Sequence, residues 1–374
     1  MRIAHIADLH LGIKIGEISL LEDQRFILEK IINGIRDEKA DVLVISGDIY
    51  DRGVPPQEAV QLFGSFLSDA KKVTDSIIII SGNHDSAERL SFGSGFFANS
   101  GIYISHAFDG KMEYVDLEDE YGICRIWMLP FVKPAIVRNY YPDIKEGSFD
   151  DAVRAVISGA GIDEKMRNIL VAHQFVTAAA DPERCDSETV YAGGTENIDC
   201  SVFSPFDYVA LGHLHTPQHM GKETIRYSGS PLKYSFSEAK KDKSLTIADI
   251  KSKGDISIET LPLVPMRDMR EVRGYISEIM EMPASEDYMR ATLLDENVEN
   301  AADKLRTVFP NIMRVDFDNA YTREMITDFG TDFEGRSDIE LFSDFFRMMS
   351  EREMSEIELD IVRKAFEEAK EDQA

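Results

Sequence analysis

The most constraining feature of the sequence is a set of almost continuously apolar runs that end abruptly in Asp, Asn or His. The runs DVLVIS and SIIIIS end in Gly-Asp and Gly-Asn-His, at residues 41–48 and 76–84. Strands that are apolar on both faces are typical of sheets covered by helices, and the segment at 56–72 between them has apolar residues at helical spacing. The chain is therefore predicted to adopt an α/β layer fold with buried strands.

Three further apolar runs end in the same kind of polar signature, at residues 2–10, 168–173 and 208–215. Open α/β sheets bind their ligands beyond the carboxyl ends of the strands, so we expect all five strand ends to line one site. The polar side chains at these strand ends are Asp8, His10, Asp48, Asn83, His84, His173, His213 and His215.

These side chains have the chemistry and spacing of metal ligands. Asp8 and His10 are two residues apart, as are His213 and His215, so each pair shares one face of its strand end. Carboxylate and imidazole groups suit Mn²⁺, Fe²⁺ or Zn²⁺. A lone His of this kind is most often a buried structural residue, but the ordered set exceeds what one ion needs. It predicts two ions about 3.5–4 Å apart, bridged by a shared carboxylate.

Charge and composition limit the classes of function. Lys and Arg number 41 against 68 Asp and Glu, a net charge of −27, which is the wrong sign for unaided tight binding of nucleic acid. Three cysteines without a CxxC pair argue against a disulfide framework or a structural zinc site. Without a run of about 18 apolar residues, no membrane-spanning segment is predicted. Because the cysteines do not indicate disulfides, we expect a protein of the reducing cytoplasm.

The composition and residue pattern of the sequence change twice along the chain, which divides it into three segments. Residues 1–261 form the predicted site-bearing domain, in which the acidic segment 113–121 is read as a solvated hairpin or loop. Residues 262–330 have no His and form a predicted small α+β domain, with a helix at 297–309. Residues 336–374 have two amphipathic helical patterns, which either pack on the body or dock on a partner.

The motifs resemble those of calcineurin-type metallophosphoesterases. The longer segments HIADLHLG, GDIYDRGVPP, GNHDSAERL, FDYVALGHLHTPQ and YSGSPLKYSFSEA resemble the SbcD family of bacterial double-strand-break repair nucleases. The resemblance is strong from Met1 to about Asp249 and looser beyond. It implies a β-sandwich flanked by helices, then a small capping domain, then helices that bind an SbcC-type ABC ATPase at the root of its coiled coil.

The resemblance also implies a role for each site residue. One ion would be held by Asp8, His10 and His215, and the other by Asn83, His173 and His213, with Asp48 bridging both. His84 would not be a ligand; it would stabilise or protonate the leaving oxygen, and Asp85 would accept a hydrogen bond from its ring. Two divalent ions are implied, with Mn²⁺ favoured and Mg²⁺, Fe²⁺ and Zn²⁺ also compatible, and water activated by them would be the nucleophile.

The activity implied is 3′→5′ exonuclease action on duplex ends and endonuclease action on single-stranded or hairpin DNA, in repair, recombination and replication. The implied partners are DNA and the ATPase, in a heterotetramer of two plus two subunits. A homodimer is expected through residues 65–71 and 86–98. Asp51 stands where some relatives carry a His, so the role of that His is not transferred.

Two other functions fit the same motifs. A phosphatase or phosphodiesterase acting on a small molecule or phosphoprotein would share the metal site, but the segment YSGSPLKYSFSEA and the terminal helices weigh against it. A purely structural subunit that clamps a partner is disfavoured because an unused cluster of buried His and Asp is costly to maintain.

Overall fold

A computed structural model of the chain describes residues 1–179, 181–188, 196–319, 338–350 and 352–371. It divides into two compact units. The first contains residues Met1–Glu271 and Glu286–Met289, and the second contains Val272–Ser285 and Arg290–Ala374. Parts of the predicted segments 262–330 and 336–374, namely 320–330, 336–337, 351 and 372–374, lie outside the described residues.

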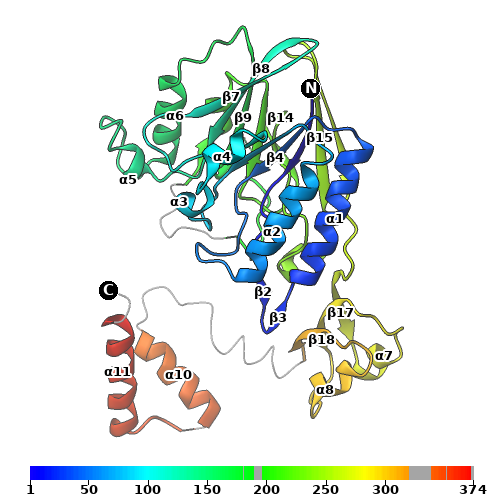
Figure 1. Ribbon diagram of the computed structural model, residues 1–374. Coiled ribbons are helices and arrows are strands. Elements are labelled where there is room, and N and C mark those ends of the chain that lie inside the picture. The colour runs from blue at the N-terminus through cyan, green and yellow to red at the C-terminus, as the bar shows by residue number, and fades with distance from the viewer. Residues whose placement is uncertain (180, 189–195, 320–337, 351, 372–374) are drawn as a thin grey trace. The chain divides into compact units, whose positions relative to one another are not determined.

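The first unit is built on two six-stranded sheets (Figure 1). In the first sheet, β1, β4, β5 and β6 are parallel, and β15 pairs antiparallel with both β1 and β16. Its order is β16 (Ile256–Pro262), β15 (Ser244–Ile250), β1 (Arg2–Ile6), β4 (Val42–Ser46), β5 (Ser76–Ile80) and β6 (Ile102–Ile104). The register pairs Ile6 with Ile45 and Ser46 with Ile80, so β1, β4 and β5 end at one edge.

The second sheet has parallel strands β8, β9, β12 and β14, with antiparallel strands β7 and β13 at its edges. Its order is β13 (Gln218–Met220), β14 (Lys222–Tyr227), β12 (Tyr208–Gly212), β9 (Arg167–His173), β8 (Gly122–Leu129) and β7 (Glu113–Asp119). Gly212 lies opposite His173, so β9 and β12 also end together. The acidic segment 113–121, expected to be a hairpin or loop, forms the edge strand β7 and the turn of a hairpin with β8.

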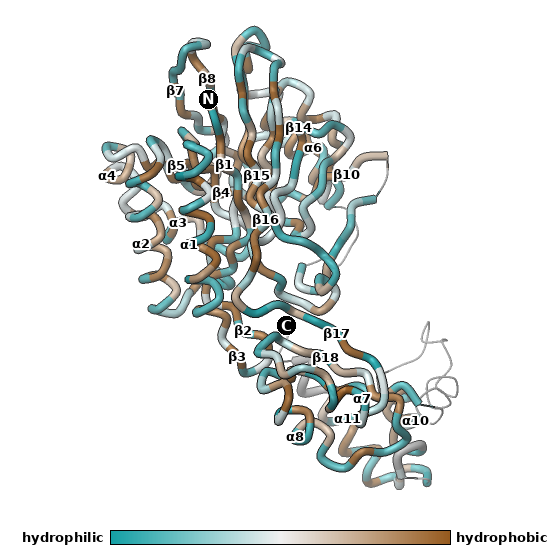
Figure 2. Tube along the Cα trace, turned by 90° about the vertical axis from the view of Figure 1, so that its right-hand side faces the viewer, coloured by the Kyte–Doolittle hydropathy of each residue, from teal (hydrophilic) through white to brown (hydrophobic). Residues whose placement is uncertain are grey.

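The two sheets pack face to face, which explains why their strands are apolar. Side chains such as Val44 and Ile78 from the first sheet meet Ile126 and Val171 from the second in one buried cluster. Figure 2 shows hydrophobic residues concentrated along these strands. Removing this much apolar surface from water is the main force that holds the layers together.

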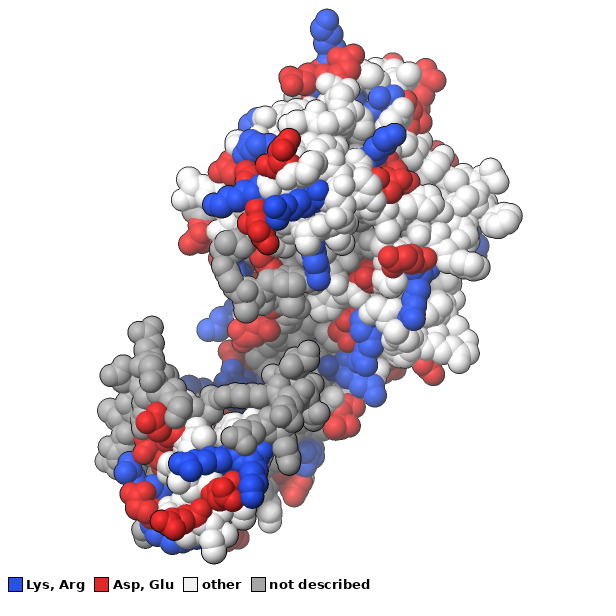
Figure 3. Space-filling model, turned by 90° about the vertical axis from the view of Figure 1, so that its left-hand side faces the viewer, with Lys and Arg blue, Asp and Glu red and all other residues white. Residues whose placement is uncertain are grey.

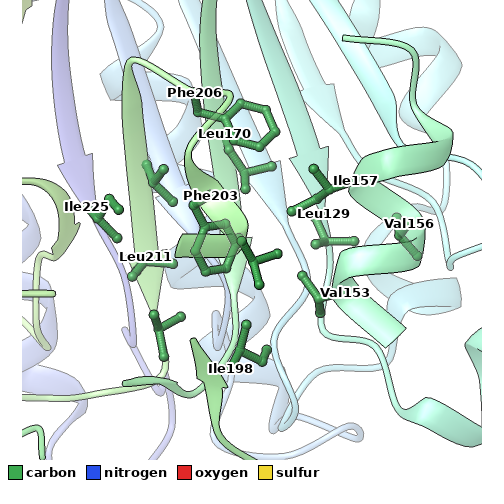
Figure 4. Packing of buried hydrophobic residues seen from close by; sticks show 14 of the residues in the cluster. Leu129, Val153, Val156, Ile157, Leu170, Ile198, Phe203, Phe206, Leu211 and Ile225 are labelled. Atoms are coloured by element: carbon green, nitrogen blue, oxygen red, sulfur yellow. The ribbon is translucent and has the colours of Figure 1, made fainter. Parts of the chain in front are cut away.

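Helices cover the outer faces of the sandwich, as the resemblance implies. Two of them are α1 (Leu21–Asp37) and α2 (Gln57–Ala70), and α2 corresponds to the helical pattern at 56–72. On the second sheet, α6 (Phe149–Gly159) buries Val153, Val156 and Ile157 against Leu129 and Leu170 (Figure 4). The β-sandwich flanked by helices that was predicted is therefore confirmed.

Shorter elements connect these layers. They are the strands β2 (Lys14–Ile15), β3 (Ile18–Ser19), β10 (Val176–Thr177) and β11 (Ile198–Asp199), and the short helices α3 (Ala87–Leu90), α4 (Ser94–Ala98), α5 (Pro134–Val137), η1 (Cys200–Phe203) and η2 (Phe236–Glu238). Among the described residues, no helix is both long and apolar enough to cross a membrane.

A third, three-stranded sheet has the order β17-β18-β19. Its strands are β17 (Met269–Gly274), β18 (Tyr288–Leu293) and β19 (Ile312–Phe317), with helices α7 (Ile276–Met280) and α8 (Ala301–Arg306). The helix expected at 297–309 is shorter in the structure, because Asn300 before it has a left-handed backbone conformation. The second unit ends with α10 (Asp338–Ser350) and α11 (Glu356–Glu371), which contact each other.

Candidate metal centre

The site begins where the strands end, because the backbone there leaves the extended conformation. Asp8, His10, Asp48 and His213 have φ values of 53°, 42°, 48° and 106°. A non-glycine residue with positive φ costs of order 1–3 kcal/mol, so the surrounding structure has to hold it there. The N–H groups of Asp8 and His10 donate to the carbonyls of Gly47 and Asp48, at 3.1 and 3.0 Å, which holds the two neighbouring loops together.

Two glycines allow these strand ends to approach each other. A Cβ atom at Gly47, where φ is +87°, would lie 2.3 Å from Nδ1 of His173. A Cβ atom at Gly212 would lie 1.9 Å from the carbonyl oxygen of Ser46. Ser46 and Gly47 lie at the end of β4 in the first sheet, and His173 and Gly212 end strands of the second sheet. The two sheets can therefore meet at this edge only because both glycines lack a side chain.

One group of donor atoms is formed by Asp8, His10 and His215, all buried. Their potential ligand atoms lie within 4.8 Å of one another. The Nε2 atoms of His10 and His215 are 3.2 Å apart. Two imidazole nitrogens that face each other at this distance present their lone pairs to one point, as two ligands of a single cation do.

A second group of donor atoms is formed by Asn83, His173 and His213. Oδ1 of Asn83 lies 3.0 Å from Nε2 of His173 and 3.0 Å from Nδ1 of His213. Asp48 stands between the two groups, because its Oδ2 is 3.7 Å from Nε2 of His10 and 3.3 Å from Nε2 of His173. The structure thus brings together all seven side chains that were expected to hold metal.

His84 lies beside these groups, and the position of Asp85 corrects one expectation. We expected the ring of His84 to donate to Asp85, but its Nδ1 lies 2.8 Å from the carbonyl oxygen of Asp51. The Asp85 carboxylate instead accepts from the N–H groups of Ile49, Tyr50 and Gly82, each at 3.0 Å. A short carboxylate that follows His84 immediately reaches the loop backbones more readily than the ring of its neighbour. Asp85 therefore ties together the loops after β4 and β5.

The electrostatics of the site favour a bound cation. Burial raises the pKa of Asp8 to about 7, and burial with a further contribution from Asp48 raises that of Asp85 to about 6. Burial alone would lower the pKa of His173, but the Asp48 carboxylate outweighs it and raises the value to about 9. Among the described residues, the ion pairs of Asp8 and Asp48 are with His and not with Lys or Arg. A buried donor set of two carboxylates, four imidazoles and one amide oxygen fits divalent cations.

Sequence reasoning missed the residues that hold His215. Ser187, Glu188 and Glu238 surround it, and Glu188 accepts from the His215 N–H at 2.7 Å. Glu238 lies in the segment YSGSPLKYSFSEA, which contributed to the resemblance without any assigned role. The S-x-x-E pattern of Ser235–Glu238 was the available signal, and it does form a capping box at η2.

Two protein families match most of the chain. The calcineurin-like phosphoesterase family matches residues 1–217, and the type 5 capsule protein repressor C-terminal domain matches residues 265–350. A dimetal phosphatase structure from Danio rerio aligns over 71% of this chain and 96% of its own, with 13% identity and a TM-score of 0.46.

Two curated relatives are both named as the SbcD component of the nuclease SbcCD. The protein from Staphylococcus epidermidis is 32% identical over 97% of each chain, and that from Staphylococcus saprophyticus is 34% identical over 84% of each chain. Because this similarity extends far beyond the phosphoesterase motifs, the chain belongs to the SbcD family of calcineurin-like phosphoesterases.

Proposed function

We propose that this chain is the nuclease subunit of an SbcCD-type complex and hydrolyses DNA phosphodiester bonds with two divalent cations. The observation that carries the proposal is the position of Asp48 between two groups of donor atoms. Hydrolysis with two ions needs both held close together, so that the attacking and leaving oxygens are stabilised at once.

The donor atoms divide naturally between two cations. Asp8, His10 and His215 would hold one, Asn83, His173 and His213 the other, and Asp48 both. When bound, the cations supply Lewis-acid activation of water and neutralise charge on the phosphate. The resemblance to the SbcD family favours Mn²⁺, and Mg²⁺, Fe²⁺ and Zn²⁺ are also compatible with these nitrogen and oxygen donors.

His84 is positioned to act on the leaving group. A carbonyl oxygen can only accept, so Nδ1 of His84 carries a proton that it donates to Asp51, and the ring is held in one orientation. When Nε2 carries a second proton, the ring would offer that Nε2–H to the leaving oxygen and stabilise or protonate it. Asp85 contributes indirectly, because it fixes the loops that carry Asp48 and His84.

The reaction class follows from the relatives, both of which are named as nucleases. From the family resemblance of the sequence motifs we further infer 3′→5′ exonuclease action on duplex ends and endonuclease action on single-stranded or hairpin DNA, in repair, recombination and replication. A nuclease with this role would act in the cytoplasm, where bacterial DNA lies.

A partner would supply most of the attraction for DNA. The chain has a net charge of −27, and on the face drawn in Figure 3 Lys and Arg are interspersed with Asp and Glu. Two divalent cations would add only four positive charges. We infer that an SbcC-type ATPase provides the basic surface, and that the isolated chain binds DNA weakly, with an affinity that falls steeply as salt rises.

The helices α10 and α11 are the proposed docking segment for that ATPase. The rings of Phe342 and Phe366 meet between them with centroids 6.2 Å apart. Ile357 and Ile361 lie one helical turn apart on α11 and are 75% and 61% exposed. An exposed apolar stripe on a helix of this kind fits the groove or coiled-coil root of a partner.

A homodimer is the proposed assembly of the nuclease domain, with two ATPase subunits completing the complex. Within the expected region 86–98, Phe92 and Phe96 are 85% and 84% exposed, and Phe97 is partly exposed beside them. Exposed aromatic residues clustered over α3 and α4 mark a protein-binding surface.

The test uses end-labelled duplex and hairpin DNA with the purified chain and Mn²⁺. We expect a ladder of products that disappears with a chelator and with His84→Ala, and that persists with His219→Ala, which changes an exposed His on β13. Metal-dependent hydrolysis of an aryl phosphate without DNA cleavage, either alone or with the ATPase, would instead identify a phosphatase.

A further inference from the structure

A buried ion pair lies beside the group of donor atoms formed by Asp8, His10 and His215. Glu238 is fully buried and Lys243 nearly so, and the Lys243 ammonium lies 2.5 Å from Oε2 of Glu238. Lys243 also donates to the carbonyl oxygen of His215 and to Oγ of Ser230, each at 2.8 Å. Buried ion pairs are often no more stabilising than apolar residues, so a fully enclosed pair next to a site points to another use.

Glu238 reaches the ring of His215 through Ser187. Oγ of Ser187 lies 2.8 Å from Oε1 of Glu238 and 2.9 Å from Nδ1 of His215. An ionised carboxylate can only accept hydrogen bonds, so the Ser187 hydroxyl donates to Glu238. The oxygen of that hydroxyl then accepts a hydrogen bond from the Nδ1–H of His215. Lys243 and the N–H groups of Tyr234 and Ser235, at 3.1 and 3.0 Å, all stabilise Glu238 as an anion.

This direction of hydrogen bonding fixes the tautomer of His215. With its proton on Nδ1, the neutral ring has a free electron pair on Nε2. Nε2 is the atom that lies 3.2 Å from Nε2 of His10. The unprotonated nitrogen of His215, Nε2, is therefore the one that points toward His10 and the donor group.

The same segment also supports the other residues of this group. The Tyr234 hydroxyl donates to the carbonyl oxygen of Leu9, between Asp8 and His10, at 2.6 Å. The Tyr234 ring meets the rings of His10 and His215 edge-on, with centroids 5.5 and 5.7 Å away. His173, in the second donor group, is oriented differently, because its Nδ1 donates to the carbonyl of Ser46 at 2.8 Å.

We propose that Ser187, Glu238 and Lys243 form a positioning relay that holds His215 ready for one of the two cations. The inference rests on the proposed metal centre and deepens it. These three residues do not touch the substrate; they act through His215. Loss of the relay should weaken one cation site and spare the other. Residues that orient metal-binding histidines in this way typically change metal affinity by about 10–100-fold.

The test is Mn²⁺ titration of the metal-free chain by calorimetry, with manganese electron paramagnetic resonance at two equivalents. Ser187→Ala removes the bridging hydroxyl from a half-buried loop position, so we expect it to fold normally. It should weaken one Mn²⁺ site by about 10–100-fold, spare the other, and replace the coupled-pair signal with that of single ions. Ser187→Thr, which keeps the hydroxyl, should restore both sites.

Two matched controls separate the relay from general loop contacts. Ser237→Ala removes a hydroxyl that accepts from the N–H of Asp186 at 2.9 Å, in the same contact between segments. Glu238→Gln is paired with Glu183→Gln, which changes an exposed carboxylate bound to Lys241. Thermal unfolding of each metal-free variant reports on folding. Glu238→Gln should reproduce the selective loss, and both controls should bind two Mn²⁺ normally.

Each outcome has one meaning. Unchanged binding of both ions by Ser187→Ala and Glu238→Gln, or equal weakening of both sites, would overturn the relay while the metal centre stands. If the wild-type chain binds no pair of Mn²⁺ ions, the proposed metal centre fails and the relay fails with it.

Discussion

Nδ1 of His84 lies 2.8 Å from the carbonyl oxygen of Asp51, to which it donates a hydrogen bond, and this contact holds the ring in one orientation. The ring stands nearly perpendicular to that of His10, with centroids 4.8 Å apart. His84 is thus held next to the donor atoms by a backbone oxygen that no substitution at position 51 removes.

Replacement of His84 should affect the chemical step. We expect His84→Gln to lower kcat for a phosphodiester by about 10²–10⁴-fold, the usual contribution of an acid or base catalyst. Mn²⁺ affinity and KM should stay within twofold, as measured by titration and steady-state kinetics, and His219→Gln should match the wild type. A parallel loss of Mn²⁺ affinity would make His84 a ligand instead.

Asp48 should matter to both cations, because its Oδ2 faces both donor groups. Asp48→Asn removes the bridging charge, so we expect both Mn²⁺ ions to bind at least about 10-fold more weakly and cleavage to be lost. Calorimetric titration checks this, with Asp303→Asn, at an exposed position, as the control. Retention of one Mn²⁺ site at full affinity would show that Asp48 belongs to a single site.

Acid should remove the stabilising contribution of Asp119, whose Oδ2 accepts from Nη1 of Arg167 at 2.9 Å. Burial would raise the pKa of Asp119, but the hydrogen bonds from Arg167 hold it well below the usual range. A lowered folded-state pKa stabilises the fold above the unfolded value of about 4, and the effect is lost as the pH falls through the folded value.

We therefore expect Asp119→Asn to lower the free energy of unfolding by about 2 kcal/mol at pH 7. The difference from the wild type should be constant down to about pH 5 and shrink below about pH 4. Urea denaturation in chelator-containing buffer measures it without bound cations. Asp69→Asn, which affects an exposed pair with Lys72, should change little at any pH.

Acidic substitutions in the apolar stripe of α11 should abolish partner binding without changing the hydrolytic activity. We expect the double variant Ile357→Asp and Ile361→Asp to lose binding to an SbcC-type ATPase in a pull-down of the two purified proteins. Hydrolysis of an aryl phosphodiester with Mn²⁺ should be unchanged. Lys364→Ala on the same helix is the control. If the double variant still binds the ATPase, Ile357 and Ile361 are not part of the docking surface.

Acidic substitutions of the exposed phenylalanines should dissociate the proposed homodimer into monomers. We expect Phe92→Asp with Phe96→Asp to sediment as a monomer under conditions where the wild type sediments as a dimer. Val264→Asp, at another exposed apolar position, should leave the dimer intact. A dimer that survives both aromatic substitutions would place the interface elsewhere.

The strand ends could be predicted from the sequence because apolar runs and the polar residues after them are local signals. Asp48 and Asn83 were therefore placed correctly at the edge of a sheet. The sequence does not show which strands pair, so the division into two sheets came only from the resemblance. The acidic segment 113–121 was correctly expected to form a hairpin, but its place at the edge of the second sheet was not predicted, because the sequence does not show which strands are neighbours. The contact of Ser187 with Glu238 joins residues 51 positions apart, and no local pattern records it.

The donor atoms of the metal centre come from both layers of the sandwich. Asp8, His10 and Asp48 follow strands of the first sheet, and His173 and His215 belong to the second. A cation shared by Asp48 and one of these histidines would act as a removable cross-link between the layers. Its binding would require the two layers to be packed together, and it would stabilise the folded chain by RT ln(1 + [M]/Kd). Cation supply would thus govern how long the folded nuclease survives, in addition to how fast it cuts.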